Sequence, residues 1–212
     1  MYTLFYSPST ASTAAHWMLI ELDVPFDLRL VDFEARQQKS PEFLALNPSG
    51  HVPVLVIEGR PHAELAALLM LLAERHPERS LAPAPSEAGR ADYLQRMLFL
   101  ANTVQPAFRA WFYPHEPAGA ENAAAVQAAA RVKLEAVWDQ VEAWFEDGRH
   151  YALGDRLTAL DFLLTILMRW SRNLPRPATG WPRLKAYADR MRTLPSLREV
   201  HAREGLTDWI ND

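Results

Sequence analysis

Hydroxyl side chains are concentrated in residues 7–13, which read SPSTAST. This stretch lies between a predicted strand at 2–6 and a predicted helix that starts near residue 13. Hydroxyls at a helix start cap its free N–H groups, and together with the helix N-terminus they can also stabilise an anion. Four side chains have the type and position for either role: Ser9, Thr10, Ser12 and Thr13.

A proline stands where a strand is predicted to begin, in residues 47–55 (NPSGHVPVL). Proline has no N–H and is disfavoured inside a sheet, so Pro53 indicates a bend directly before the apolar strand at 54–57. Further along, Glu64 opens the apolar segment ELAALLMLLAER, which predicts a buried helix. An acid in the first turn of a helix complements the helix dipole, so Glu64 has a purely structural interpretation as well.

The residue types present also exclude several kinds of chemistry. The chain contains no cysteine, which excludes disulfides, thiolate metal sites and any thiol chemistry of the protein itself. The histidines show no ligand spacing, so no metal is expected. Phosphate- and dinucleotide-binding glycine motifs are absent from the sequence.

The elements that must position these residues fall into two groups. The first eighty residues predict the order β-α-β-(α)-β-β-α, with a tight hairpin turn at Glu58-Gly59. After a segment rich in proline and serine, only helices are predicted, and Thr158 and Asp161 form a plausible capping box. The predicted helices cover 88–112, 121–146, 158–173, 181–193 and 196–203. We therefore predict an α/β domain at 1–78, a linker at 79–87 and an all-α domain at 88–212.

Bulk composition is that of a globular protein. The 212 residues are 49% apolar and carry a net charge of −4, which gives no reason to expect a nucleic-acid surface. Neither a membrane-spanning segment nor a signal peptide is visible, so we expect a cytoplasmic protein that does not bind membranes.

Four stretches together resemble the cytosolic glutathione S-transferases over nearly the whole chain. They are LFYSPSTAS (4–12), KSPEFLALNPSGHVPVL (39–55), the helix led by Glu64, and GDRLTALDF (154–162). The resemblance is nearest to the bacterial beta class, whose catalytic cysteine aligns with Ala11. It implies a thioredoxin-like N-terminal domain, an all-α C-terminal bundle and a homodimer.

By resemblance, the first domain binds glutathione. The Val52–Pro53 bond is expected to be cis, which presents the main-chain groups of Val52 to the cysteinyl unit of glutathione as a short added strand. Glu64 is expected to bind the γ-glutamyl ammonium. The family has a serine at the next position, and Leu65 replaces it, so one hydrogen bond to the glutamyl carboxylate is expected to be lost. The backbone N–H of Leu65 and the helix N-terminus are still expected to bind that carboxylate. Two further side chains are candidates for contact with glutathione: Lys39 and His51.

The thiol of glutathione must become a thiolate, and we expect a hydroxyl of this chain to stabilise it. Ser12 is the first candidate because it follows the position of the family cysteine; Ser9 and Tyr6 are the alternatives. Because the chain has no thiol, it cannot form a mixed disulfide with glutathione, which excludes cysteine-based thiol–disulfide exchange.

The second substrate is expected to meet the aromatic stretch FRAWFYPHE. Candidate pocket residues are Phe108, Trp111, Tyr113 and His115. Phe108 and Phe112 also have the helical spacing of core residues. The function expected from the resemblance is conjugation of glutathione to a small hydrophobic electrophile. The alternatives are a glutathione-dependent isomerase or lyase, and a non-catalytic binding protein of the same fold, which the loss of the family serine, cysteine and His-Lys pair would favour.

Overall fold

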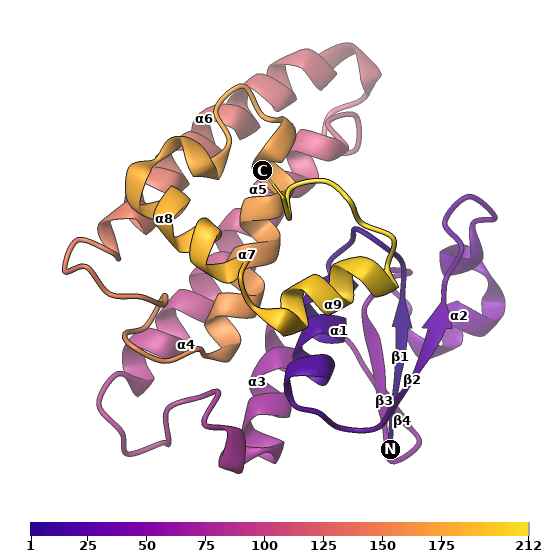
Figure 1. The fold of residues 1–212 in the computed structure, drawn as a ribbon. Coiled ribbons are helices and arrows are strands. Elements are labelled where there is room, and N and C mark those ends of the chain that lie inside the picture. Colours follow the sequence, from indigo (N-terminus) through magenta and orange to yellow (C-terminus); the bar gives the residue numbers. More distant parts are fainter. Residues whose placement is uncertain (212) are drawn as a thin grey trace. The chain divides into compact units, whose positions relative to one another are not determined.

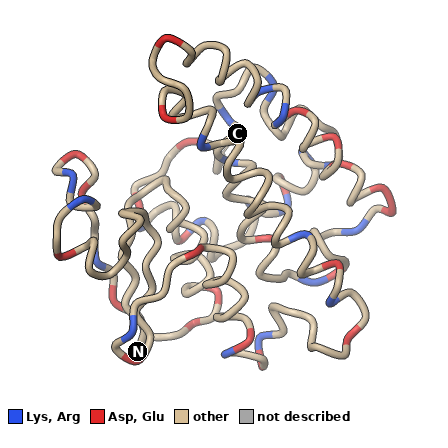
Figure 2. The backbone as a smooth tube through the Cα atoms, turned by 180° about the vertical axis from the view of Figure 1, so that it is seen from behind, with Lys and Arg blue, Asp and Glu red and all other residues tan. Residues whose placement is uncertain are grey.

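The computed structural model describes residues 1–211, which divide into two compact units. The first contains residues 1–82 together with the C-terminal segment that starts at Arg192, and the second contains residues 83–191. Basic and acidic positions are interspersed along the backbone of both units (Figure 2). Among the helices of the described chain, none combines the length and the apolar character needed to cross a bilayer.

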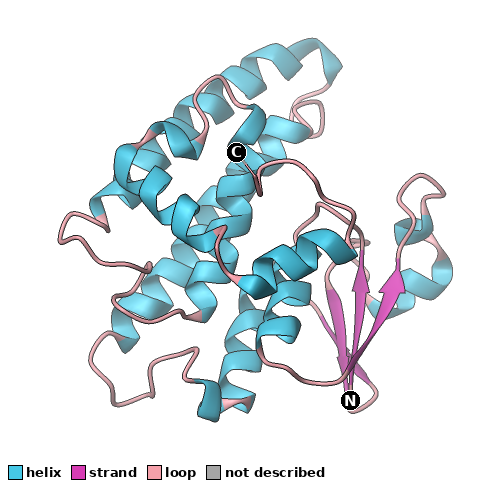
Figure 3. Cartoon of the chain, viewed as in Figure 1, coloured by secondary structure: helices cyan, strands magenta, loops and turns pink. Residues whose placement is uncertain are grey.

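A four-stranded sheet forms the centre of the first unit (Figures 1 and 3). Its strands are β1 (Tyr2–Tyr6), β2 (Phe26–Leu30), β3 (Val54–Ile57) and β4 (Arg60–His62), in the order β2-β1-β3-β4. β1 and β2 are parallel, whereas β3 is antiparallel to both β1 and β4. With its helices, this sheet forms the thioredoxin-like domain expected from the sequence.

Helix α1 (Ser12–Glu21) provides the crossover that two parallel strands require, and it is the most deeply buried helix of this unit. Its residues from Ser12 to Leu19 are all buried, and the helix contacts α3 (Leu65–Arg75) and α9 (Pro195–Arg203). The indole Nε1 of Trp17 donates to Ser196 Oγ at 2.8 Å, which fixes α1 against α9. α2 (Pro41–Leu46) and two 3₁₀ turns, η1 (Gln37–Lys39) and η2 (Pro77–Arg79), complete the unit.

The predicted hairpin turn is confirmed. Glu58 has φ 52° and Gly59 has φ 77°, and two consecutive positive φ values are typical of the type I′ turns that join two-residue hairpins. The turn places β4 next to β3, with Ile57 opposite Arg60.

The second unit is all helical, as predicted. Its helices are α4 (Arg90–Phe99), α5 (Gln105–Phe112), α6 (Ala123–Ala143), α7 (Ala159–Trp170) and α8 (Pro182–Met191). Its short turns are η3 (Leu100–Val104), η4 (Ala120–Asn122), η5 (Ser171–Asn173) and η6 (Ala178–Gly180).

The single helix predicted over 88–112 is interrupted. Residues 100–104 form a π-helical turn between α4 and α5, and Pro106 lies in the first turn of α5. Because proline cannot donate to a carbonyl in the preceding turn and its ring crowds that carbonyl, the α-helical ladder widens there.

Helix α7 is the buried centre of the second unit, and its predicted capping box is present. The main-chain N–H of Thr158 donates to Asp161 Oδ2 at 2.8 Å, and the N–H of Ala152 donates to Oδ1 at 2.8 Å. Burial raises the pKa of the Asp161 carboxyl to about 6, and the hydrogen bonds it accepts offset this only in part.

The predicted helix at 196–203 exists as α9, but its contacts group it with the first unit. The sequence-based division had kept these residues in the all-α domain at 88–212. The boundaries at 78 and 88 stay a prediction.

Candidate functional site

The turn before β3 is built by one side chain. Asn47 Nδ2 donates to the carbonyl of His51 at 2.8 Å, while Asn47 Oδ1 accepts from the N–H of Ser49 at 3.1 Å and from its hydroxyl at 2.9 Å. Gly50 closes the turn with φ +67°, which favours glycine. The Val52–Pro53 peptide bond that follows is cis, as predicted.

The main chain of Val52 has no hydrogen-bond partner in the described part of the chain. Within residues 1–211, no hydrogen bond engages its N–H or its C=O, although its side chain is buried and β3 begins only two residues later. Unpaired main-chain groups beside a strand can pair with an extended ligand.

The side chains of Lys39 and His51 both contact Ser49 in this turn. Lys39 Nζ donates to the carbonyl of Ser49 at 3.5 Å, and His51 Nδ1 lies 3.3 Å from Ser49 Oγ. Gly50 makes this approach possible, because a Cβ there would lie 2.6 Å from Lys39 Nζ and 2.8 Å from the carbonyl oxygen of Gln38. The structure therefore brings together two of the predicted site residues, both exposed.

Glu64 has an unusual backbone conformation at the start of α3. Its φ is 68° and its ψ is 96°, which a residue with a Cβ rarely adopts. Its exposed carboxylate forms no hydrogen bond or ion pair within the described chain, and it does not cap α3. Leu65 is 5% exposed and belongs to the core. Strained backbone at an exposed acid is typical of a binding position rather than of a stabilising one.

The hydroxyl of Ser12 is wholly engaged inside the loop between β1 and α1. Ser12 is 0% exposed; its Oγ accepts from the N–H of Ser7 at 3.1 Å, lies 3.0 Å from the carbonyl of Ser7, and lies 2.8 Å from Thr10 Oγ1. Thr10 Oγ1 also donates to the carbonyl of Ser7 at 2.7 Å. The two hydroxyls thus tie the loop to itself, which is a structural role.

Ser9 and Tyr6, the two alternatives, are both partly exposed. Ser9 has φ 62°, and its N–H donates to Glu204 Oε2 at 3.2 Å. The ring of Tyr6 contacts the ring of His16 edge-on, with centroids 5.6 Å apart. Sequence reasoning missed Glu204, which is separated from Ser9 by 195 residues and lies in no recognisable motif.

The aromatic stretch of the second unit divides into buried and exposed residues. Phe108 is fully buried, beside Trp138 and Trp170. The expectation that Phe112 is also core is wrong: it is 45% exposed, because it is the last residue of α5, although its ring contacts those of Phe108 and Trp170. α5 does end before Pro114, as predicted.

The remaining candidates in this stretch are at or near the surface. Tyr113 is 40% exposed, with the guanidinium of Arg109 4.0 Å from the centre of its ring. Trp111 is partly buried, and its carbonyl accepts from Gln127 Nε2 at 3.1 Å. His115 is exposed.

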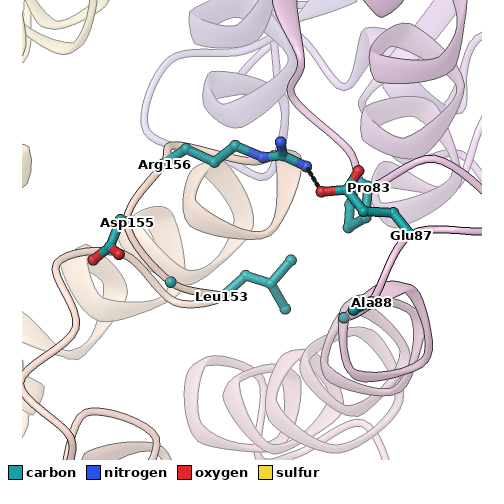
Figure 4. A pocket seen from close by; sticks show the side chains of 8 residues that line it. Pro83, Glu87, Ala88, Leu153, Asp155 and Arg156 are labelled. Atoms are coloured by element: carbon teal, nitrogen blue, oxygen red, sulfur yellow. Dashed lines mark hydrogen bonds and ion pairs between the residues drawn. The ribbon is translucent and has the colours of Figure 1, made fainter.

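A cavity of about 330 Å³ in the second unit contains none of the predicted site residues. It lies between the start of α4 and the loop that precedes α7, and an ion pair between Arg156 and Glu87, at 2.7 Å, crosses it (Figure 4). Apart from Asp155, its other lining residues are small or apolar, and no group of side chains in it has an evident catalytic role. Within residues 1–211, no cluster of three His, Cys, Asp or Glu side chains forms a candidate metal site.

Comparison with known proteins identifies the family. The glutathione S-transferase N-terminal domain matches residues 8–75, and the glutathione S-transferase C-terminal domain matches residues 97–195. A relative from Xanthomonas campestris, glutathione S-transferase GST-4.5, is 30% identical over 206 residues, which cover 96% of this chain and 98% of the relative.

Solved structures agree with this assignment. A glutathione transferase homologue from Sulfitobacter with bound glutathione has a TM-score of 0.89 at 26% identity, covering 98% of this chain and 99% of its own. A sphingomonad glutathione S-transferase complexed with glutathione has a TM-score of 0.83 at 30% identity, covering 97% of this chain and 100% of its own. The chain belongs to the glutathione S-transferase family.

Proposed function

We propose that this protein is a glutathione S-transferase that conjugates the thiolate of glutathione to a small hydrophobic electrophile. The observation that carries the proposal is the main chain of Val52, which lies just before β3 and is unpaired within the described residues, in a chain of this family. The cysteinyl unit of glutathione pairs with that N–H and C=O like a short strand.

The two charged ends of glutathione are bound by side chains near this edge. The carboxylate of Glu64, which has no partner among residues 1–211, binds the γ-glutamyl ammonium. Lys39 and His51, which meet at Ser49, bind the glycine carboxylate. The main-chain N–H of Leu65 binds the glutamyl carboxylate at the start of α3, since its side chain cannot donate.

Activation of the thiol needs a hydrogen-bond donor at sulfur. A free thiol has a pKa near ~8.5, and lowering it by two units takes about 2.7 kcal/mol of preferential stabilisation of the thiolate. We take Ser9 as the donor, because the hydroxyl of Ser12 is fully buried and bonded to Ser7 and Thr10. Ser12 acts indirectly, by holding the loop, and Tyr6 is the remaining alternative.

The electrophile binds to the aromatic side chains near the end of α5. Trp111, Tyr113 and His115 are available there, while Phe108 supports them from the core. The protein acts in the cytoplasm as a homodimer. Leu98 on α4 is 50% exposed and Val132 on α6 is 64% exposed, and exposed apolar side chains of this kind suit a subunit interface.

Retention on immobilised glutathione, followed by conjugation of chlorodinitrobenzene, tests the proposal. We expect retention and turnover in the parent protein. Ser9→Ala lowers kcat on the order of 100-fold if Ser9 donates to sulfur, and Ser86→Ala, at an exposed loop position, is the matched control. If Ser9→Ala keeps full activity and Tyr6→Phe loses it, Tyr6 and not Ser9 is the donor to the sulfur of glutathione.

A non-catalytic binding protein is the second candidate, and Leu65 in place of a donor is the observation that favours it. Retention on glutathione without turnover of any electrophile would support it. Turnover that rearranges or cleaves a substrate without forming a conjugate would instead indicate an isomerase or lyase.

A further inference from the structure

Glu204 is a buried carboxylate in the C-terminal segment of the first unit. It directly follows α9, and its side chain is 0% exposed. Within the described chain it forms no ion pair with lysine or arginine. Burial of an acid is costly unless hydrogen bonds replace water, so its partners indicate why it is there.

Three donors surround the carboxylate. Oε2 accepts from the N–H of Ser9 at 3.2 Å and from the hydroxyl of Thr13 at 2.8 Å. Oε1 lies 2.8 Å from His16 Nδ1, which donates to it. All three come from the β1–α1 loop and from α1, although Glu204 itself belongs to the C-terminal segment.

The bond to Ser9 has a geometric consequence. Ser9 has φ 62°, a left-handed conformation that serine adopts rarely. The acceptor at Glu204 holds its N–H in that conformation. The direction of the Ser9 side chain therefore depends on a residue at the opposite end of the sequence.

We propose that Glu204 is a positioning residue for thiol activation: through the N–H of Ser9 and the hydroxyl of Thr13, it fixes the β1–α1 loop in the conformation that presents its donors to the sulfur of glutathione. This inference rests on the proposed function. It assigns a role to a residue that does not touch the substrate and acts only through Ser9 and α1.

The direction in which the pKa of the bound thiol changes distinguishes a positioning role of Glu204 from an effect of its charge and from a purely stabilising role. A negative charge near sulfur disfavours the thiolate, so removal of that charge alone lowers the pKa of the bound thiol. Loss of positioning removes donors from the thiolate and raises that pKa. A purely stabilising role leaves the pKa of the bound thiol unchanged in whatever fraction of the protein folds.

The experiment titrates glutathione bound to the parent protein, Glu204→Gln and Thr13→Val, by the ultraviolet absorbance of the thiolate. Thr13→Val removes one donor and keeps the charge, so it remains informative if Glu204→Gln folds poorly. Glu199→Gln is the matched control: it lies on α9, is exposed and pairs only with Arg203, at 2.5 Å, among the described residues. Binding of S-methylglutathione, which has no ionisable thiol, is measured alongside.

We expect the pKa of the bound thiol to rise in both variants, with kcat/KM falling between about 10- and 100-fold and with S-methylglutathione affinity unchanged. Glu199→Gln should match the parent. An unchanged or lowered pKa of the thiol in both folded variants overturns the inference while the proposed function stands. A parent protein that binds neither glutathione nor S-methylglutathione overturns the proposed function, and the inference with it.

Discussion

Nδ1 of His16 lies 2.8 Å from Oε1 of Glu204, and neither side chain has any exposed surface. The imidazole is enclosed by the rings of Tyr6 and Phe26, each with its centroid 5.6 Å away. His16 therefore links strands β1 and β2 to the C-terminal segment of the first unit. Its other nitrogen, Nε2, is buried with no hydrogen-bond partner among the described residues.

His16→Phe removes the donor to Glu204 and keeps an aromatic ring in the enclosure. Because a buried carboxylate oxygen then loses a partner, we expect the free energy of unfolding to fall by about 1–3 kcal/mol. Urea denaturation followed by tryptophan fluorescence measures it. His150→Phe, at an exposed position, should stay within about 0.5 kcal/mol of the parent, and equal stability of the two variants would refute a stabilising role for the buried pair.

Glu64→Gln tests the ammonium site. The amide keeps the size of the side chain and removes its charge, and a hydrogen bond to a charged group contributes about 1.5–3 kcal/mol, so we expect glutathione affinity to fall by about 10- to 100-fold. Calorimetric titration with glutathione measures it.

The matched control is Glu58→Gln. Glu58 is also an exposed acid with positive φ, but its carboxylate pairs with Arg75 at 2.6 Å. Its substitution should leave glutathione affinity unchanged. An equal loss in both variants would mean that net charge, and not the position of Glu64, determines binding.

Local patterns predicted those features that depend on a few neighbouring residues. The Glu58-Gly59 turn and the capping box of Thr158 and Asp161 are both encoded within four residues and both are present. The cis bond before Pro53 was implied by the family motif. Of these features, the cis bond belongs to the candidate site.

Features that depend on distant parts of the chain were not predictable. The bond of Ser9 to Glu204 joins residues 195 positions apart, and no periodicity marks it. The burial of Ser12 follows from the way its loop folds on Ser7, which residue type alone does not reveal. The exposure of Phe112 depends on where α5 ends relative to its neighbours, and helical spacing indicated core there.

Leu65→Ser restores a hydroxyl at the position where the family has one. We expect glutathione to bind more tightly, by up to about 10-fold, because the glutamyl carboxylate gains a donor. Leu65 is 5% exposed, so the same change removes a core side chain and should lower the free energy of unfolding by about 2–4 kcal/mol.

Calorimetric binding and urea denaturation of the same preparations measure the two effects of Leu65→Ser. Leu65→Ala is the matched control, since it creates the cavity without the hydroxyl. If the alanine and serine variants bind glutathione equally, the missing hydroxyl is not what limits affinity at this position.

Burial of Asp161 determines the direction in which the free energy of unfolding changes with pH. Its pKa rises from 3.8 to about 6 in the folded protein, so the folded state keeps this proton at a pH where the unfolded state has lost it. The contribution of this group to the free energy of unfolding is therefore fully present below about pH 4, decreases as pH rises, and is lost above about pH 6. The shift corresponds to about 3 kcal/mol.

The side chain that Asp161→Asn introduces does not titrate. Comparison of the parent with this variant therefore separates the pH dependence due to Asp161 from that of other acids, whose pKa values also change with burial or pairing. The amide leaves some of the donors from Thr158, Ala152 and Tyr187 unsatisfied, so the variant should be less stable than the parent at every pH. The difference in free energy of unfolding between parent and variant should be larger at pH 4.5 than at pH 7.5. Urea denaturation at the two pH values measures it, and a difference that grows with pH would mean that the hydrogen bonds from these donors, and not burial, control the pKa of Asp161.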